Sequence, residues 1–213
     1  MNKTANVVII GGGISGCSIA YNLAKKGVKD IVVIERQYLA SGSTGRCGAG
    51  IRMQWGTERN CRLSKLSTEF YENANEELGA VHDIEFKQGG YLIVAATEKE
   101  VEQFKKNVAL QNSLGIPSVY LSPKEAKEII PHMDETKILG ATFCPKDGHL
   151  NPFHTTEAFA NAAKRLGVEF MTYTTVTGIT TDKGKVTGVQ TDKGYISTPI
   201  VVNAAGGYSK KIG

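Results

Sequence analysis

A short apolar run that ends in clustered glycines limits what this chain can fold into more than any other feature. Residues 6–10 read NVVII, a β-branched run typical of a parallel strand that is covered on both faces. The glycines that follow, Gly11, Gly13 and Gly16, have the spacing GxGxxG. Small and apolar residues then recur at helical spacing over residues 17–27, and a glycine ends the run. The pattern predicts a strand, a tight turn and a helix.

A second apolar run indicates what this turn binds. Residues 30–34, DIVVI, predict a second strand, and the acidic Glu35 stands directly at its end. In such units the first glycine permits the turn, the second lets a pyrophosphate approach the backbone, and the third lets the helix pack closely on the strand. The acid accepts hydrogen bonds from ribose hydroxyl groups. The combination predicts a dinucleotide site but does not distinguish FAD from NAD.

The stretch SGSTGRCGAGIR, residues 41–52, favours FAD. It holds four glycines, three hydroxyl residues and two arginines in twelve positions. Buried strands are richer in branched apolar residues, and a glycine costs about 1 kcal/mol relative to alanine inside a helix. We therefore expect a loop against which something lies. A loop of small residues at this point can follow the pyrophosphate and ribityl chain of FAD.

The chain resembles the D-amino-acid oxidase superfamily of flavoproteins, which includes glycine oxidase, sarcosine oxidase and the flavin-carrying β subunits of heterotetrameric sarcosine oxidase and dye-linked L-proline dehydrogenase. The likeness is carried by VVIIGGGISGCSIAYNLAKKG, IVVIER, SGSTGRCGAGIRMQWG, DGHLNPF and VVNAAGGYS. It implies an α/β fold, with a Rossmann-like FAD-binding domain of the glutathione-reductase type. It further implies that an incomplete α+β substrate domain is inserted into this domain.

The motif and the resemblance together assign the cofactor site. The histidine that dimethylglycine-dehydrogenase-like relatives carry near the loop is absent, since Arg46 and Cys47 occupy the region, so we expect FAD to be bound non-covalently. The expected FAD-contacting residues are Gly11, Gly13, Ile14, Ser15, Gly16, Glu35, Arg36, Gly42, Ser43, Thr44, Arg46, Cys47, Gly48, Ala49, Gly50, Ile51, Val176, Ala204, Ala205 and Gly206.

Arg52 is the candidate catalytic residue. In sarcosine-oxidase-like enzymes an arginine that matches this position grips the substrate carboxylate. A guanidinium suits this task because its planar fork forms two hydrogen bonds with a carboxylate and stays charged. The resemblance implies oxidation of the C–N bond of an amino acid or N-methylated amino acid, such as glycine, sarcosine or a proline-like compound, by hydride transfer to the flavin. A surface arginine without such a role is the alternative interpretation.

The sequence pattern in the middle of the chain predicts an inserted domain. A helix is expected from about residue 57 to residue 78, and residues 88–96 predict a strand. Capping boxes that begin at Thr97 and Ser122 predict two further helices. The expected helix over 57–78 has an apolar stripe of Leu63, Leu66, Phe70, Ala74 and Leu78. The expected domains are residues 1–85, the first part of the FAD-binding domain; residues 86–144, the partial substrate domain that roofs the flavin; and residues 145–213, the second part of the FAD-binding domain.

The sequence patterns in the last part of the chain predict that it returns to the first domain. Asn151 and Pro152 can cap and start a helix, and residues 168–176 predict a strand. Two DKG turns then separate three extended runs and predict a β-meander, before the buried strand of PIVVNAAGG. The expected inner face of the helix comprises Phe159, Ala162, Ala163 and Leu166.

Composition excludes several other classes of protein. A net charge of +4 on scattered lysines gives no arginine-rich tract of a nucleic-acid surface. No apolar run approaches the roughly 20 residues of a transmembrane helix, and no signal peptide is recognisable, so we expect a cytoplasmic protein. The cysteines form no disulfide or zinc pattern. His149 and His154 lack the spacing and the third ligand of a metal site, and His82 and His132 stand isolated, so no metal is expected.

The expected partners are a small amino acid or amine substrate and, by the resemblance to β subunits, other subunits of an oxidase or dehydrogenase. The resembling families continue considerably further, so we expect these 213 residues to be an incomplete enzyme. Two alternatives stay open. One is another flavin- or NAD-dependent oxidoreductase, and the other is a non-catalytic FAD-binding fragment or subunit of a larger complex.

Overall fold

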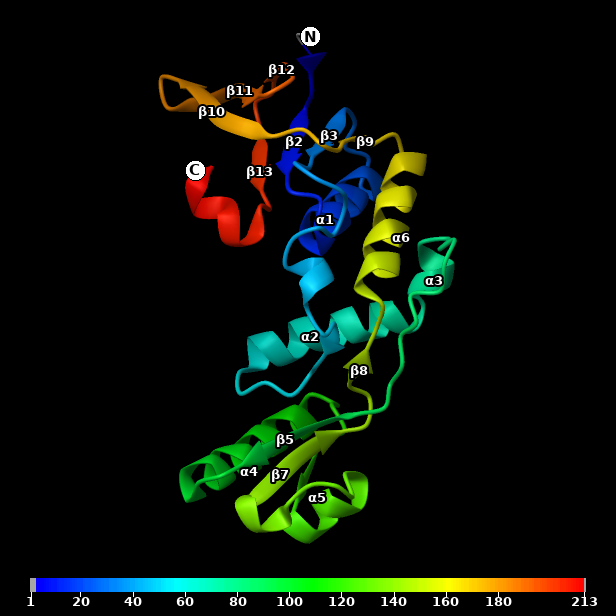
Figure 1. The fold of residues 1–213 in the computed structure, drawn as a ribbon, viewed down its shortest axis with the longest axis vertical. Coiled ribbons are helices and arrows are strands. Elements are labelled where there is room, and N and C mark those ends of the chain that lie inside the picture. The colour runs from blue at the N-terminus through cyan, green and yellow to red at the C-terminus, as the bar shows by residue number, and fades with distance from the viewer. Residues whose placement is uncertain (1–2, 213) are drawn as a thin grey trace. The chain divides into compact units, whose positions relative to one another are not determined.

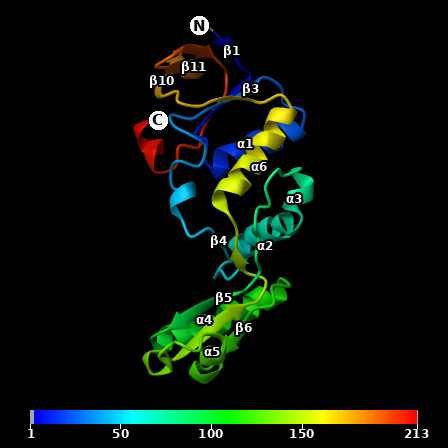
Figure 2. The same ribbon diagram turned by 45° about the vertical axis from the view of Figure 1, so that its right-hand side comes forward.

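The computed structural model describes residues 3–212, which form two compact units (Figures 1 and 2). Unit 1 comprises Met1–Ala49, Ala74–Ile84 and Asn151–Gly213, and unit 2 comprises Gly50–Asn73 and Glu85–Leu150. The chain therefore leaves unit 1 twice and returns to it twice. The domain bounds expected from the sequence, 1–85, 86–144 and 145–213, stay a prediction.

Unit 1 has a parallel sheet at its centre. Its four strands lie in the order β13-β2-β3-β9, and all neighbours are parallel. The elements of unit 1 are β1 (Lys3–Thr4), β2 (Val7–Ile10), α1 (Ile14–Lys25), β3 (Ile31–Ile34), η1 (Thr44–Arg46), α3 (Ala74–Glu77), α6 (Pro152–Arg165), β9 (Glu169–Met171), β10 (Val176–Asp182), β11 (Lys185–Thr191), β12 (Gly194–Ser197), β13 (Val201–Asn203) and η3 (Gly206–Lys211).

The central strands are apolar at every position because both faces of the sheet are covered. All four residues of β2 and of β3 are buried. Helices α1 and α6 lie side by side against one face (Figure 1), where the rings of Tyr21 and Phe159 meet edge to face at 5.8 Å. On the other face Val8 and Val32 pack with Val189 of the meander. The predicted α/β architecture is confirmed.

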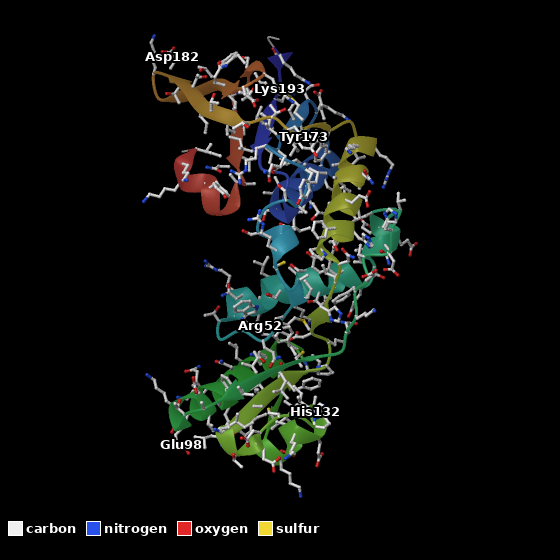
Figure 3. The ribbon with its side chains drawn as sticks, in the orientation of Figure 1. Arg52, Glu98, His132, Tyr173, Asp182 and Lys193 are labelled. Carbon is white, nitrogen blue, oxygen red and sulfur yellow. The ribbon has the colours of Figure 1, made fainter. Side chains whose placement is uncertain are left out.

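The meander follows the two predicted DKG turns. Strands β10, β11 and β12 are antiparallel, and β1 adds to β12 in parallel. Asp182 and Lys193 mark the two turns in Figure 3. Lys183 adopts a left-handed φ of 48° ahead of Gly184, as a tight hairpin turn requires. The predicted meander is confirmed.

Unit 2 is built around a three-stranded antiparallel sheet in the order β5-β7-β6. Helices α4 and α5 pack against it, and a two-stranded ladder pairs β4 with β8. The elements of unit 2 are β4 (Gly50–Ile51), α2 (Glu58–Glu72), β5 (Tyr91–Ala95), α4 (Glu98–Ser113), β6 (Val119–Leu121), α5 (Pro123–Ile129), η2 (Glu135–Lys137), β7 (Gly140–Cys144) and β8 (Gly148–His149).

The prediction of one helix over residues 57–78 is wrong in the length of the helix and in the face that it buries. The structure ends α2 at Glu72 and starts the separate helix α3 at Ala74. Leu63 and Leu66 are 64% and 66% exposed, so the predicted stripe is not a core stripe there. The buried residues of α2 are instead Cys61 and Thr68. Their spacing of seven residues selects a different face of the same helix.

Three further elements also differ from their predictions. The strand expected over 168–176 is confined to β9, because Tyr173 takes a left-handed φ of 50° and turns the chain. Leu166, expected on the inner face of α6, is 40% exposed, since it is the C-cap at which the helix has already ended. The strand expected over 88–96 is the shorter β5.

Among residues 3–212, no helix has both the length and the apolar character that crossing a membrane requires.

Candidate functional site

A cavity of about 540 Å³ opens in unit 1 at the carboxyl ends of the parallel strands. This edge is where open α/β sheets bind their ligands, because the loops that leave the strands converge there. The cavity is lined by Ile10, Gly11, Gly13, Ile14, Ser15, Ile34, Glu35, Arg36, Ser41, Gly42, Ser43, Thr44, Thr174, Thr175, Val176, Ala204, Ala205, Gly206, Gly207, Tyr208, Lys211 and Ile212.

The glycine turn is held by contacts that leave no room for side chains. Gly11 has a φ of +114°, and a Cβ there would lie 2.4 Å from the carbonyl oxygen of Ala204. A Cβ on Gly16 would lie 1.9 Å from the carbonyl oxygen of Gly11, far inside van der Waals contact. Helix α1 therefore starts directly against the end of β2. Gly13, the N-cap of α1, has no side chain of its own, and the first residues of the helix line the cavity.

The Glu35 carboxylate lies beside the glycine turn. Its Oε2 accepts a hydrogen bond from the Gly12 backbone N–H at 2.7 Å, and its Oε1 accepts one from the Gln37 N–H at 2.9 Å. The carboxylate is thereby fixed between β2 and β3. The Ser41 hydroxyl also donates to Oε1, at 3.4 Å, so the remaining acceptor capacity of this cavity-lining carboxylate is mainly on Oε2.

The first half of the small-residue loop folds back onto this turn. The backbone N–H of Ala40 donates to the Gly12 carbonyl at 3.0 Å. The hydroxyl of Thr44 accepts a hydrogen bond from the Ile14 N–H at 3.1 Å, which satisfies one of the free amides at the start of α1. Loop and turn thus form one wall of the cavity, which explains the small residues of the loop's first half.

Cationic side chains border the same cavity. The Arg36 guanidinium lies 3.9 Å from the centroid of the Tyr208 ring. A hydrogen bond from Arg36 and its positive charge lower the pKa of the Tyr208 phenol, with smaller contributions from Arg46 and Lys211. A phenol held this way ionises more readily than an isolated tyrosine. The arrangement favours negative charge at this end of the cavity.

Arg52 lines a second cavity, of about 420 Å³, which lies within unit 2. Arg52 follows β4, and Figure 3 labels it there. Its guanidinium stacks on the Trp55 ring, 4.2 Å from the ring centroid. Within residues 3–212, no side chain or carbonyl is found to accept a hydrogen bond from this guanidinium. The cavity is lined by Gly50, Ile51, Arg52, Trp55, Leu63, Ser64, Ser67, Tyr71 and Tyr91.

A buried carboxylate anchors the segment that carries Arg52. Asp147 is fully buried, and its Oδ1 accepts the Met53 backbone N–H at 2.8 Å while its Oδ2 accepts the Gln54 side-chain N–H at 3.0 Å. Burial raises the pKa of Asp147, and the hydrogen bonds from Gln54 and Met53 partly oppose this. The two residues that follow Arg52 are thereby tied to the turn after β7, which ends at Cys144.

The structure brings most, but not all, of the predicted cofactor residues to one of the two cavities. Most of the expected FAD-contacting residues that lie in unit 1 line the 540 Å³ cavity, including the distant Val176 and Ala204. Gly16 does not line it and acts through packing instead. Four further predicted residues line neither of the two cavities: Arg46, Cys47, Gly48 and Ala49. Gly50 and Ile51 line the 420 Å³ cavity with Arg52. Their roles stay predictions.

The chain matches the family described as FAD dependent oxidoreductase (DAO) over residues 6–213. This match covers nearly the whole sequence. The chain belongs to the FAD dependent oxidoreductase family. The resemblance drawn from the sequence is thereby confirmed.

Relatives and solved structures in this family support the assignment. The chain is 34% identical to the mitochondrial sarcosine dehydrogenase of Mus musculus, over 99% of this chain and 23% of that protein. It is 33% identical to sarcosine oxidase subunit beta of Arthrobacter sp, over 97% and 52%. The structure of L-proline dehydrogenase from P. horikoshii superimposes with a TM-score of 0.90 at 42% identity, over 100% of this chain and 55% of that one. The chain thus spans about half or less of each relative's length.

The family's cofactor fits the 540 Å³ cavity of unit 1. An FAD needs amide donors and cations for its pyrophosphate and an acid for a ribose, and α1, Arg36 and Glu35 supply them. The close contacts at Gly11 and Gly16 keep the backbone surface free of side chains. The chemistry of the donors therefore agrees with the family.

Several lining residues were missed from the sequence. Thr174, Thr175, Tyr208 and Lys211 line the 540 Å³ cavity, yet none of them belongs to the glycine motif or to the small-residue loop. The backbone N–H of Thr174 donates to the Glu35 carbonyl at 3.0 Å, and this contact brings that segment alongside the acid. The one available signal was the position of Tyr208 and Lys211 just after the strand of PIVVNAAGG.

His82 is not isolated, contrary to the prediction. Its ring stacks on that of His154 with centroids 5.2 Å apart, and its Nδ1 lies 2.9 Å from Glu157 Oε2. The stacking is possible because α6 brings His154 beside the loop that carries His82. Across the described chain, no three His, Cys, Asp or Glu side chains are arranged to hold a metal ion.

Proposed function

We propose that the chain is the FAD-binding part of an oxidoreductase that oxidises the C–N bond of an amino acid or N-methylated amino acid. The observation that carries this proposal is the 540 Å³ cavity, where the glycine turn, Glu35 and Arg36 converge. Bound FAD supplies the two-electron acceptor for such an oxidation. The names of the relatives, sarcosine dehydrogenase and L-proline dehydrogenase, support substrates of the N-substituted amino acid type.

The protein's own residues have two tasks in this proposal. In unit 1, the start of α1 and Arg36 bind the pyrophosphate of FAD, and Glu35 accepts hydrogen bonds from a ribose of FAD. In unit 2, Arg52 binds the substrate carboxylate and so fixes which carbon is presented for oxidation. The Trp55 ring lies against the Arg52 guanidinium and so helps to orient it.

FAD is expected to bind without a covalent bond and to cover Cys47. Cys47 is exposed, whereas Cys17, Cys61 and Cys144 are buried. Burial raises the pKa of the Cys17 thiol to about 12, so this thiol is unreactive in the folded protein. A disulfide reagent such as DTNB should therefore modify one thiol rapidly, and saturating FAD should slow that reaction at least tenfold.

The control for this experiment is Cys47→Ser, which should bind FAD and lose the rapid phase. Acid precipitation of the FAD-loaded protein should release all the flavin into the supernatant. Flavin that stays with the precipitate would contradict non-covalent binding. A rapid phase that FAD leaves unchanged would place the cofactor away from the loop.

Replacing Arg52 with glutamine should weaken the binding of small carboxylates about 10- to 100-fold, because a hydrogen bond to a charged group contributes about 1.5–3 kcal/mol. Trp55 is the single tryptophan of the sequence and lies against Arg52, so its fluorescence reports binding directly. Sarcosine or L-proline titrated into the wild-type chain should change this emission. The test thus needs no turnover.

The matched control is Arg62→Gln, because Arg62 lies on α2 in the same unit and pairs with Glu58 on the exposed surface. It should leave the carboxylate affinity unchanged. If Arg52→Gln and Arg62→Gln bind sarcosine and L-proline equally well, Arg52 has no role in carboxylate recognition.

A second candidate function is a non-catalytic or auxiliary FAD-binding subunit. The 33% identity to a protein named sarcosine oxidase subunit beta favours a chain that works with other subunits. Anaerobic addition of sarcosine or L-proline to the FAD-loaded chain distinguishes the catalytic function from the auxiliary one. Bleaching of the flavin absorbance supports catalysis, and unchanged absorbance despite bound FAD supports the auxiliary role.

A further inference from the structure

The indole of Trp55 contacts two polar groups of the 420 Å³ cavity at once. Its face carries the Arg52 guanidinium, 4.2 Å from the ring centroid. Its Nε1–H donates to the hydroxyl of Ser64 at 2.8 Å and to the Arg52 carbonyl at 3.0 Å. Arg52 and Ser64 come from different elements, the segment after β4 and helix α2, and both line the cavity. One side chain therefore sets the positions of both groups.

The proton of the Ser64 hydroxyl is available for a ligand. A serine hydroxyl has one donor and two acceptor sites, and the Trp55 N–H uses an acceptor site. No group of the described chain is found to accept the Ser64 proton. Ser67, one turn away on α2 and in the same cavity, differs, because its hydroxyl donates to the Leu63 carbonyl at 2.9 Å.

The lining of this cavity selects a class of ligand. Arg52 is the single charged residue among the lining residues given above, so the cavity suits one carboxylate group rather than two. The walls are formed largely by Trp55, Tyr71 and Tyr91. Aromatic faces accommodate apolar carbons and also attract an ammonium group. A small amino acid with one carboxylate and an N-alkyl or ring substituent has this combination of groups.

We propose that Ser64 is a second donor to the substrate carboxylate and that Trp55 is the positioning residue for both donors. This inference rests on the proposed function of Arg52. The guanidinium contributes the charge, and the Ser64 hydroxyl donates one more hydrogen bond to the same carboxylate. The substrate class that this pair recognises is a small monocarboxylic amino acid.

Ser64→Ala is expected to weaken the binding of sarcosine and L-proline to the chain about 10-fold, measured by isothermal titration calorimetry. Ser67→Ala is the matched control, and it should change the affinity less than twofold because that hydroxyl is already bonded within α2. Ser64→Thr keeps the hydroxyl and should restore the binding. The amino alcohol 2-(methylamino)ethanol resembles sarcosine but lacks the carboxylate, so its weaker binding should not respond to Ser64→Ala.

Trp55→Phe tests the positioning role, because it keeps an aromatic face for Arg52 but removes the N–H that holds Ser64. Trp55→Phe should lower the carboxylate affinity. In the Trp55→Phe background, Ser64→Ala should then have a clearly smaller effect than the tenfold loss expected in the wild-type chain. Thermal unfolding of each variant checks that unit 2 remains folded.

The outcomes separate this inference from the proposed function. Loss of binding in Arg52→Gln with unchanged binding in Ser64→Ala would overturn the role of Ser64 and leave Arg52 in place. Equal losses in Ser64→Ala and Ser67→Ala, or no rescue by Ser64→Thr, would also overturn it. If the unsubstituted chain binds neither sarcosine nor L-proline, the proposed function of Arg52 fails, and this inference fails with it.

Discussion

Gly16→Ala is expected to lower the free energy of unfolding of unit 1 by about 3 kcal/mol and to abolish measurable FAD binding. The new Cβ would lie 1.9 Å from the Gly11 carbonyl oxygen and 3.6 Å from Ile9 Cγ2. The first of these atoms belongs to the backbone, so no side-chain rotation relieves the clash. Helix α1 must move away from β2, and this shift removes the start of α1 from the cavity that it borders.

The control for this variant is Gly42→Ala. Gly42 lines the same cavity, but a Cβ there meets no atom within 4 Å, and its φ is not left-handed. It should unfold in urea at nearly the wild-type midpoint, followed by circular dichroism. If Gly16→Ala and Gly42→Ala share one midpoint and one FAD affinity, the close approach of α1 to β2 does not matter for folding.

Asp147→Ala is expected to destabilise unit 2 by about 3 kcal/mol or more, because it leaves two buried donors without an acceptor at about 1–3 kcal/mol each. These donors are the backbone N–H of Met53 and the side-chain N–H of Gln54, although the latter keeps a second bond to the Tyr91 carbonyl. The segment with Arg52 should loosen at the same time. Trp55 emission should then shift toward that of a solvent-exposed tryptophan.

The effect of Asp147 on stability should depend on pH. Its pKa is raised in the folded protein, chiefly by burial, so the folded state favours the protonated form. The stability that protonation adds is fully present below the unfolded pKa of about 3.9 and is lost as the pH rises through the folded value. The difference in unfolding free energy between wild type and Asp147→Ala should therefore be largest near pH 4 and shrink toward neutral pH.

The control is Asp134→Ala. Asp134 accepts hydrogen bonds from the N–H and the hydroxyl of Thr136 on the surface of the same unit, so its loss should cost much less than the loss of Asp147. If Asp147→Ala costs no more than Asp134→Ala, the buried carboxylate does not anchor the segment. A stability difference that grows from pH 4 to pH 7 would contradict the pH argument.

Features that depend on a few neighbouring residues were predictable from the sequence. The capping boxes at Thr97 and Ser122 and the cap by Asn151 are all present, because each is made between residues two or three positions apart. The glycine turn and the acid after β3 were recognisable for a related reason, since a ligand of fixed size sets their spacing. Periodicity was less informative for α2. Leu63 and Leu66 are apolar at helical spacing, yet the helix buries the face of Cys61 and Thr68.

The sequence alone determined the α/β class and the dinucleotide turn, because these follow from short patterns whose geometry is local, and its motifs carried the resemblance to the flavoprotein family. Only the tertiary structure placed Asp147 against Met53, 94 residues away, and Tyr208 against Arg36. It also showed that Trp55 holds Arg52 and Ser64 together. Such contacts depend on how separate elements pack, and the energy of packing is shared among many residues that no single motif contains.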